Sequence, residues 1–261
     1  MLRSLYTAAT GMEAQQLKMD VIANNLANAS TTGFKRTRPE FEDLLSEAIR
    51  APAPPDPRGG SAPTGLEAGL GVRAAATTRS LRQGDLVSTQ NPLDVAIEGS
   101  GFFQVQRPSG ELAYTRAGNF RVDAAGRLTT PHGELIDPQI NIPPEATEVT
   151  IRADGTVTAR VQGRVDALEV GRLELALFPN PGGLTSLGNN LLGATGASGD
   201  VIRLTPGDRG AGSLAQGFLE SSNVKAVEEM VDMIATQRAY ELNSKVIQTA
   251  DQILQRLTSL R

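Results

Sequence analysis

The chain has no cysteine and no tryptophan, and its 261 residues include a single histidine. The absence of cysteine excludes disulfides, thiolate zinc sites and cysteine nucleophiles. The one histidine, His132, leaves no second imidazole for a histidine-based metal site, and its place beside Gly133 is typical of a surface turn. Aromatic residues make up only 4% of the chain, which is few for one dense core and fits a modest β domain combined with helices.

The sequence also lacks long apolar runs and a strong charge of either sign. The net charge of −4 and the pI near 5.2 do not indicate a nucleic-acid surface. No stretch approaches the ~20 apolar residues of a membrane span. Charged and amide side chains interrupt the N-terminal residues, so we expect no cleaved secretory signal. The protein is therefore expected to stay in the cytoplasm or to leave it by a route without such a signal.

The motifs that suggest catalysis are fragments. The run Gly99-Ser100-Gly101 lacks the remaining positions of a phosphate-binding loop, and Asp154-Gly155 lacks the other ligand positions of a calcium loop. Glu228 and Glu229 are adjacent, so they diverge on a helix and favour a role near its positive N-terminus. We expect no catalytic residue, no cofactor, no metal ion and no enzymatic activity.

The two ends of the chain carry its clearest pattern. Residues 1–30 place large apolar residues about seven apart, with alanines beside them, which is typical of a coiled-coil seam. The predicted N-terminal self-assembly residues are Leu5, Met12, Met19, Ile22 and Leu26. Residues 223–261 predict a second amphipathic helix that begins near Ser222 or Asn223, both good N-caps. The predicted C-terminal self-assembly residues are Val224, Val227, Val231, Ile234, Val246, Ile253, Leu257 and Leu260.

The energetics of these ends favour partners. Burying a large apolar side chain gains roughly 1.5–3 kcal/mol. Ordering the backbone costs about 1–2 kcal/mol per residue, and a short isolated helix is marginal in water. We therefore expect the terminal helices to become fully ordered when they meet other subunits. The alternative is that the two helices simply pair with each other on one globular domain.

Between the ends, alternating apolar residues with recurrent Gly-containing turns predict short antiparallel strands from about residue 70 to 215. Before them, Phe41, Leu44, Leu45 and Ile49 suggest a short helix, and prolines at 52–57 break regular structure. The predicted fold class is α+β, with N- and C-terminal helices pairing as a coiled-coil-like bundle and a central, mainly antiparallel β domain. The expected divisions are an N-terminal assembly helix at 1–34, an extended connecting segment at 35–72, the β domain at 73–215 and a C-terminal assembly helix at 216–261.

Three motifs resemble the flagellar rod and hook family of axial proteins. The first is the run Ala23 to Lys35, ANNLANASTTGFK; the second runs from Asp94 to Val105, and the third from Glu229 to Lys245. Together they span nearly the whole chain in the family's order. The residues that carry the first motif are Asn24, Asn25, Leu26, Asn28, Gly33 and Phe34.

This resemblance implies a structural subunit of the basal-body distal rod, which polymerises into a helical tube and transmits torque from motor to hook. It implies type III export without a cleaved signal peptide and a place in the periplasm-spanning rod. The implied partners are further copies of the chain, proximal rod and hook subunits and the export apparatus, with the rod cap and the P and L ring proteins as further candidates. Neither nucleic acid nor integral membrane insertion is implied. A proximal rod subunit and another secreted self-assembling surface fibre protein remain the alternatives.

Overall fold

The computed structural model describes residues 2–50, 65–163 and 166–259. The chain divides into two compact units. We call Met1–Ala27, Thr37–Thr78 and Lys225–Arg261 the helical unit, and Asn28–Arg36 with Arg79–Val224 the β unit. The polypeptide therefore passes between the units four times, and both ends of the chain belong to the helical unit.

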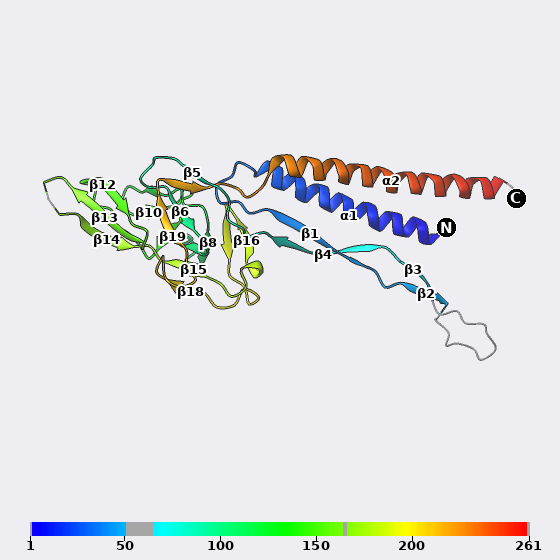
Figure 1. The fold of residues 1–261 in the computed structure, drawn as a ribbon, viewed down its shortest axis with the longest axis horizontal. Coiled ribbons are helices and arrows are strands. Elements are labelled where there is room, and N and C mark those ends of the chain that lie inside the picture. Colours follow the sequence, from blue (N-terminus) through cyan, green and yellow to red (C-terminus); the bar gives the residue numbers. More distant parts are fainter. Residues whose placement is uncertain (1, 51–64, 164–165, 260–261) are drawn as a thin grey trace. The chain divides into compact units, whose positions relative to one another are not determined.

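The helical unit is built from two long helices and a ribbon of paired strands. Helix α1 (Leu2–Ala27) lies antiparallel beside α2 (Ala226–Ser259) (Figure 1). Strand β1 (Thr37–Asp43) pairs with β4 (Val72–Arg79), and β2 (Glu47–Arg50) pairs with β3 (Leu66–Ala68). The pairing of the terminal helices is confirmed. Over its described residues, neither helix has an apolar stretch long enough to cross a membrane.

The short helix that Phe41, Leu44, Leu45 and Ile49 suggest is wrong. Half-buried and exposed residues alternate along most of β1, which is the period of a strand. Pairing with β4 supplies the backbone hydrogen bonds that a helix would otherwise provide, so tertiary contacts override the local apolar pattern. The prolines at 52–57 lie outside the described residues. Helix α2 begins at Ala226, later than Asn223, because the Asn223 side chain bonds elsewhere in the β unit.

The β unit is formed by short antiparallel strands, as the alternation predicts. Its largest sheet has the order β16-β17-β8-β7-β11-β10-β9, with β15 joining β7 to β18. A three-stranded sheet has the order β12-β13-β14, and β19–β6 and β20–β5 form two further pairs. The strands are β5 (Leu86–Ser88), β6 (Val95–Glu98), β7 (Phe102–Gln106), β8 (Leu112–Thr115), β9 (Arg121–Val122), β10 (Leu128–Thr129), β11 (Leu135–Asp137), β12 (Ala146–Ile151), β13 (Thr156–Val161), β14 (Leu168–Arg172), β15 (Leu175–Leu177), β16 (Thr185–Gly188), β17 (Leu191–Gly193), β18 (Ile202–Leu204), β19 (Ser213–Gln216) and β20 (Phe218–Glu220), with a 3-10 turn, η1 (Pro181–Gly183), between β15 and β16.

Strand β7 crosses the centre of the β unit, and both of its faces are buried. Phe103 packs edge-to-face on Phe120, with ring centroids 4.9 Å apart, inside the main apolar core. On the other face Phe102 joins Tyr114 and Phe178 in a second, smaller core. Such two-sided burial explains how a unit with few aromatic residues still builds a closed core.

Candidate functional site: the terminal helices and a buried charge cluster

The two helices lie close together at Gly11. A Cβ atom placed on Gly11 would come within 2.9 Å of the Asn243 side-chain amide, so the absent side chain allows the approach. Of the predicted N-terminal seam residues, Ile22 is buried. The others are half-buried, namely Leu5, Met12, Met19 and Leu26.

A polar contact closes the other end of the helix pair. The Asn25 amide donates to Glu229 Oε2 at 3.1 Å and to the Thr37 carbonyl at 2.9 Å. Its oxygen accepts from the Thr37 backbone N–H at 3.0 Å and from the Thr37 hydroxyl at 3.1 Å. Asn25 is 1% exposed and Glu229 is fully buried. Because buried polar groups cost free energy unless they are bonded, this contact fixes the register of α1, α2 and β1 within the helical unit.

The predicted C-terminal stripe lies away from α1. Glu229 and Asn243 contact α1, so positions seven apart from them on α2, including the buried Thr236 and Ala250, share that face. Large apolar residues of the predicted stripe are between 44% and 76% exposed, namely Val227, Val231, Ile234, Val246 and Ile253. Val224 precedes the helix and is buried in the β unit. The Leu257 side chain and Leu260 lie outside the described residues.

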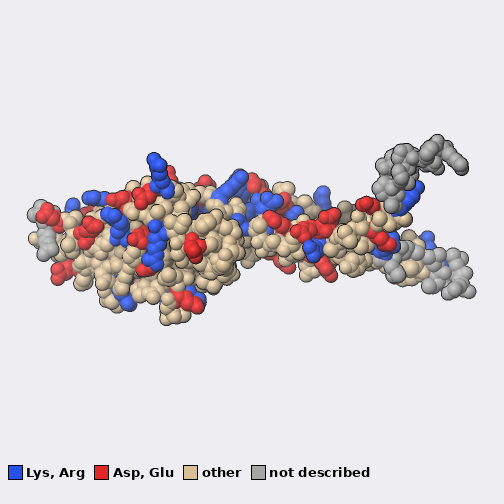
Figure 2. Space-filling view, turned by 90° about the horizontal axis from the view of Figure 1, so that it is seen from below, with Lys and Arg blue, Asp and Glu red and all other residues tan. Residues whose placement is uncertain are grey.

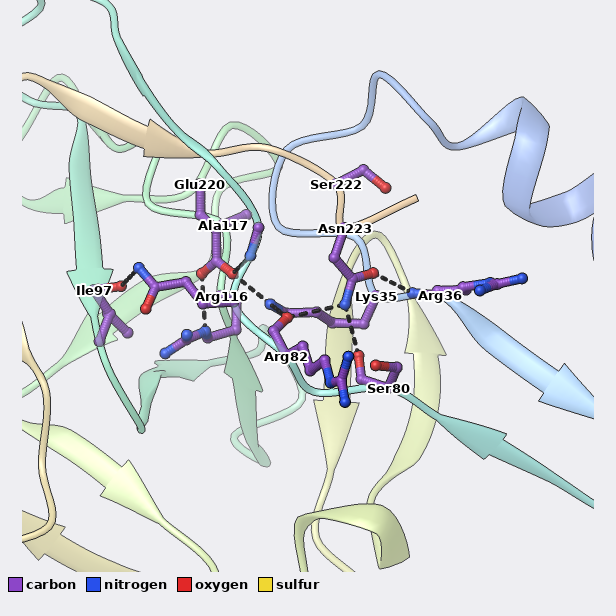
Figure 3. A network of polar contacts seen from close by, with 12 residues as sticks. Lys35, Arg36, Ser80, Arg82, Ile97, Arg116, Ala117, Glu220, Ser222 and Asn223 are labelled. Carbon is purple, nitrogen blue, oxygen red and sulfur yellow. Dashed lines mark hydrogen bonds and ion pairs between the residues drawn. The ribbon is translucent and has the colours of Figure 1, made fainter. Parts of the chain in front are cut away.

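Three charged side chains meet inside the β unit (Figure 3). Glu220, at the end of β20, pairs with Lys35 Nζ through Oε1 and with Arg116 Nε through Oε2, the latter at 3.0 Å. The side chains of Lys35, Arg116 and Glu220 are 3%, 5% and 0% exposed. Arg116 also donates to the Gly101 carbonyl at 2.7 Å and to the Gly99 carbonyl at 2.8 Å. One carboxylate therefore holds two cations away from water.

Burial governs the titration of this cluster. It lowers the pKa of Lys35 below its ordinary value, an effect that Glu220 opposes and that the nearby Arg116 reinforces. It also lowers the pKa of Arg116, again against the attraction of Glu220. The desolvation cost is therefore large enough to compete with the ion pairs, as expected for charges taken out of water.

Asn223 extends the cluster to the segments that lead into the helical unit. Its side-chain oxygen accepts the Arg36 backbone N–H at 2.7 Å, and its amide donates to the carbonyls of Ser80 and Arg82, each at 2.9 Å. Lys35 Nζ donates to the same Arg82 carbonyl at 2.8 Å. Residues 36, 80 and 223 each lie within two positions of a point where the chain leaves the β unit. One asparagine therefore ties three of the four connecting segments together.

The other residues of the first family motif shape the turn between α1 and Lys35. Gly33 has φ +70°, and a Cβ there would come within 2.7 Å of the Ala117 backbone nitrogen. Its N–H donates to the Glu220 carbonyl at 2.8 Å. Asn28 accepts the Thr31 hydroxyl at 3.1 Å, and the Phe34 N–H bonds to the Thr31 carbonyl at 3.2 Å. Asn24 and Leu26 belong to α1, the former exposed and the latter half-buried.

Sequence reasoning missed the partners of Lys35. Nothing in the spacing around Arg116 distinguishes a buried arginine from a surface one. Glu220 ends a short strand and gives no periodic signal. The one sign in the sequence is that Lys35 is the only charged residue of the first family motif, whose other residues are small, polar or apolar. Among the described residues, no group of three or more His, Asp or Glu side chains is placed to hold a metal ion.

Comparison with known proteins agrees with this arrangement. Three family models match in chain order: a flagella basal body rod protein model at residues 5–35, a flagellar hook protein FlgE/F/G D1 domain model at 96–159 and a flagellar basal body rod FlgEFG protein C-terminal model at 215–260. The flagellar basal-body rod protein FlgG of Buchnera aphidicola subsp. Schizaphis graminum is 49% identical over 260 residues, which cover 100% of both chains. The chain belongs to the FlgG family of flagellar basal-body rod proteins.

Two further FlgG proteins span distant bacteria. FlgG of Caulobacter vibrioides is 48% identical and FlgG of Bacillus subtilis 38%, and in each case the match covers 100% of both chains. The matched ranges include α1 from Leu5 onward and all of α2, together with Lys35, Arg116 and Glu220. The flagellar rod resemblance of the sequence is thereby confirmed.

Proposed function

We propose that this FlgG-family chain is a subunit of the distal rod, which polymerises through its terminal helices into a helical tube that transmits torque from motor to hook. The observation that carries the proposal is the apolar stripe on α2, whose large side chains are exposed although α1 already covers the opposite face. An exposed apolar face of this extent on a soluble helix marks an interaction surface. Polymerisation buries it against neighbouring copies.

The buried charge cluster supports this function from the β unit. Within the β unit it joins the segments that lead to the β1–β4 ribbon and to α2. A torque-bearing subunit needs such a joint, because load applied to the helices must reach the β unit without separating its strands. The role of the chain is mechanical and needs no catalytic step.

The proposal includes a site of action and partners. The chain would leave the cell through the flagellar type III export apparatus without a cleaved signal and join the periplasm-spanning rod. Its partners would be further copies of itself, proximal rod subunits on one side and hook subunits on the other, with the rod cap and the P and L ring proteins around them. Neither nucleic acid nor membrane insertion is part of the proposal. A proximal rod position is the second candidate, because the matched C-terminal model covers FlgE, FlgF and FlgG together.

The test introduces Val231→Asp and Ile234→Asp in a flagellated bacterium that lacks its own FlgG. A carboxylate in the buried interface costs several kcal/mol unless it reaches water. We expect loss of rods and of swimming, with far-UV circular dichroism of the purified chain unchanged. Gln237→Asp and Gln248→Asp place the same charge at exposed polar positions of α2 and serve as controls. Normal rods in the two stripe variants would reject the proposal.

A further inference from the structure

The stripe on α2 contains a shallow groove with a charge at its centre. Val231, Ile234, Ala235, Arg238, Ala239 and Leu242 line a volume of about 410 Å³. Arg238 is exposed and makes no ion pair with any described residue. A groove lined by apolar side chains except for one unpaired cation matches a partner groove that offers an unpaired anion beside apolar residues.

The helical unit carries a second groove with the complementary character. Its volume is about 420 Å³, and it lies between one face of α1 and the β1–β4 ribbon. Tyr6, Glu13 and Leu17 line the α1 wall, and Leu44 and Val72 line the ribbon wall. Tyr6 is 56% exposed, which is unusual for the large apolar side chains of this helix.

The charges of this groove single out one residue. Arg73, also in its lining, is 3.0 Å from Glu42 and is therefore neutralised within the unit. Glu13 is exposed and has no ion-pair partner among the described residues. The α1–ribbon groove, which Thr10 also lines, thus offers one free anion beside the apolar side chains of Tyr6, Leu17, Leu44 and Val72.

We infer that the α2 stripe of one copy docks into the α1–ribbon groove of the next copy, with Arg238 paired to Glu13. This inference rests on the proposed function and names the contact that would build the polymer. The occupant is a second copy of the chain, because both complementary surfaces are on the same unit. Since the two surfaces differ, the contact is heterologous, and repeating it produces an open helix.

The helix geometry supports this register. Copies in a helical polymer share one polarity, so the incoming α2 runs antiparallel to α1, as it does within a single copy. Pairing Glu13 with Arg238 then places Tyr6 level with the exposed Lys245, beside Leu242 and Val246. It places Leu17 opposite Ile234. The exposed Tyr6 and the half-buried Leu17 therefore meet the α2 stripe when the two charges pair.

The register also sets the displacement of neighbouring copies. Within one copy Gly11 is level with Asn243, so Glu13 is level with Glu241. Pairing Glu13 with Arg238 of the next copy moves that copy by three residues, about 4.5 Å along the helices. A small axial step of this kind suits a tube in which each copy touches the next one sideways.

A charge exchange tests the contact in the full-length chain. Glu13→Arg and Arg238→Glu each bring like charges together and should raise the critical concentration for polymerisation at least about tenfold. The double variant restores opposite charges and should return it to within about threefold of the unchanged chain. Gln16→Arg and Gln237→Glu add the same charges at exposed positions outside both grooves and should have little effect.

The outcomes separate this contact from the proposed function. If the unchanged chain forms tubes but the double variant is no better than the single variants, the docking inference is wrong and the proposed function stands. Normal polymerisation of the single variants would likewise show that the docking inference is wrong. If the unchanged chain forms no polymer and restores no rods in cells, both the contact and the proposed function fail.

Discussion

Replacing Glu220 with glutamine should destabilise the β unit far more than breaking any exposed ion pair. The substitution keeps the shape of the side chain but removes its charge. Lys35 and Arg116 are then left as two buried cations facing a neutral amide, with side chains only 3% and 5% exposed. Both cations keep hydrogen bonds to backbone carbonyls, but they lose their only carboxylate partner among the described residues.

The expected magnitude follows from burial. Removing one partner of a buried ion pair costs about 3–5 kcal/mol, because the remaining charge stays desolvated without compensation. The exposed pair Arg73–Glu42, with side chains 66% and 54% exposed, is the natural control. Breaking it with Glu42→Gln should cost about 0–1 kcal/mol. The two substitutions make the same chemical change, at a buried carboxylate with two cationic partners and at an exposed carboxylate with one.

Urea unfolding followed by far-UV circular dichroism measures both changes. The free energy of unfolding should fall by several kcal/mol in Glu220→Gln and remain nearly constant in Glu42→Gln. Lys35→Arg retains the positive charge, so its free energy of unfolding should fall less than that of Lys35→Met. A loss below about 1 kcal/mol in Glu220→Gln would refute the reasoning, because it would show that the cluster is solvated or that its charges are not coupled.

Further changes test other parts of the account. Gly33→Ala should lower stability by at least about 1–3 kcal/mol, because φ +70° is strained for alanine and its Cβ would meet the Ala117 backbone; thermal unfolding checks this. Because burial lowers the pKa of Lys35, the folded chain loses that proton at a lower pH than the unfolded chain does. The stability of the unchanged chain relative to Lys35→Met should therefore rise as the pH approaches the ordinary lysine pKa of 10.5 from below and fall again as the pH is lowered; urea titrations that show no such slope would contradict the assigned cause. Met12→Asp and Ile253→Asp should abolish rod assembly and motility while leaving the melting temperature of the β unit unchanged, which calorimetry and a swimming assay resolve. Deleting residues 52–65 should leave polymerisation intact but give curved or more flexible polymers in electron micrographs, because the prolines at 52–57 restrict the backbone. Straight polymers would show that the segment is only a spacer.

The spacing of apolar residues predicted the helices and strands well wherever it followed which side chains are buried. The strands that hold Val95, Phe103, Tyr114 and Leu175 form where apolar residues alternate, and the helices form where they recur every seven. The segment around Phe41 was misjudged because its partner strand, β4, lies some thirty residues away in sequence. No local pattern reveals such a pairing, which replaces the hydrogen bonds of a helix with those of a ribbon.

Polar residues inside the fold were the least predictable part of the candidate site. Asn223 reads as a helix cap and Asn25 as part of the first family motif, whereas in the structure both bond backbone groups of segments distant in sequence. Glu229 reads as a complement to the helix dipole and instead lies fully buried against Asn25. Each role depends on what tertiary structure brings to the side chain, so composition and spacing contain no trace of it.

The distribution of surface charge on the face drawn in Figure 2 does not by itself identify a partner. On the face drawn in Figure 2, acidic and basic side chains are interspersed. On this face, attraction between large areas of opposite sign therefore offers little, and local charge pairs set in apolar surroundings are the better means of recognition. The exposed stripe on α2 is such a place, and its predicted assembly role stays a prediction until a polymer is examined.

A helical reconstruction of the polymer formed by the full-length chain, from electron micrographs, tests the central claim most directly. The account predicts a tube in which Val231, Ile234 and Leu242 of each copy are buried against the next copy. A polymer held together only by β units, with this face of α2 open to solvent, would contradict it.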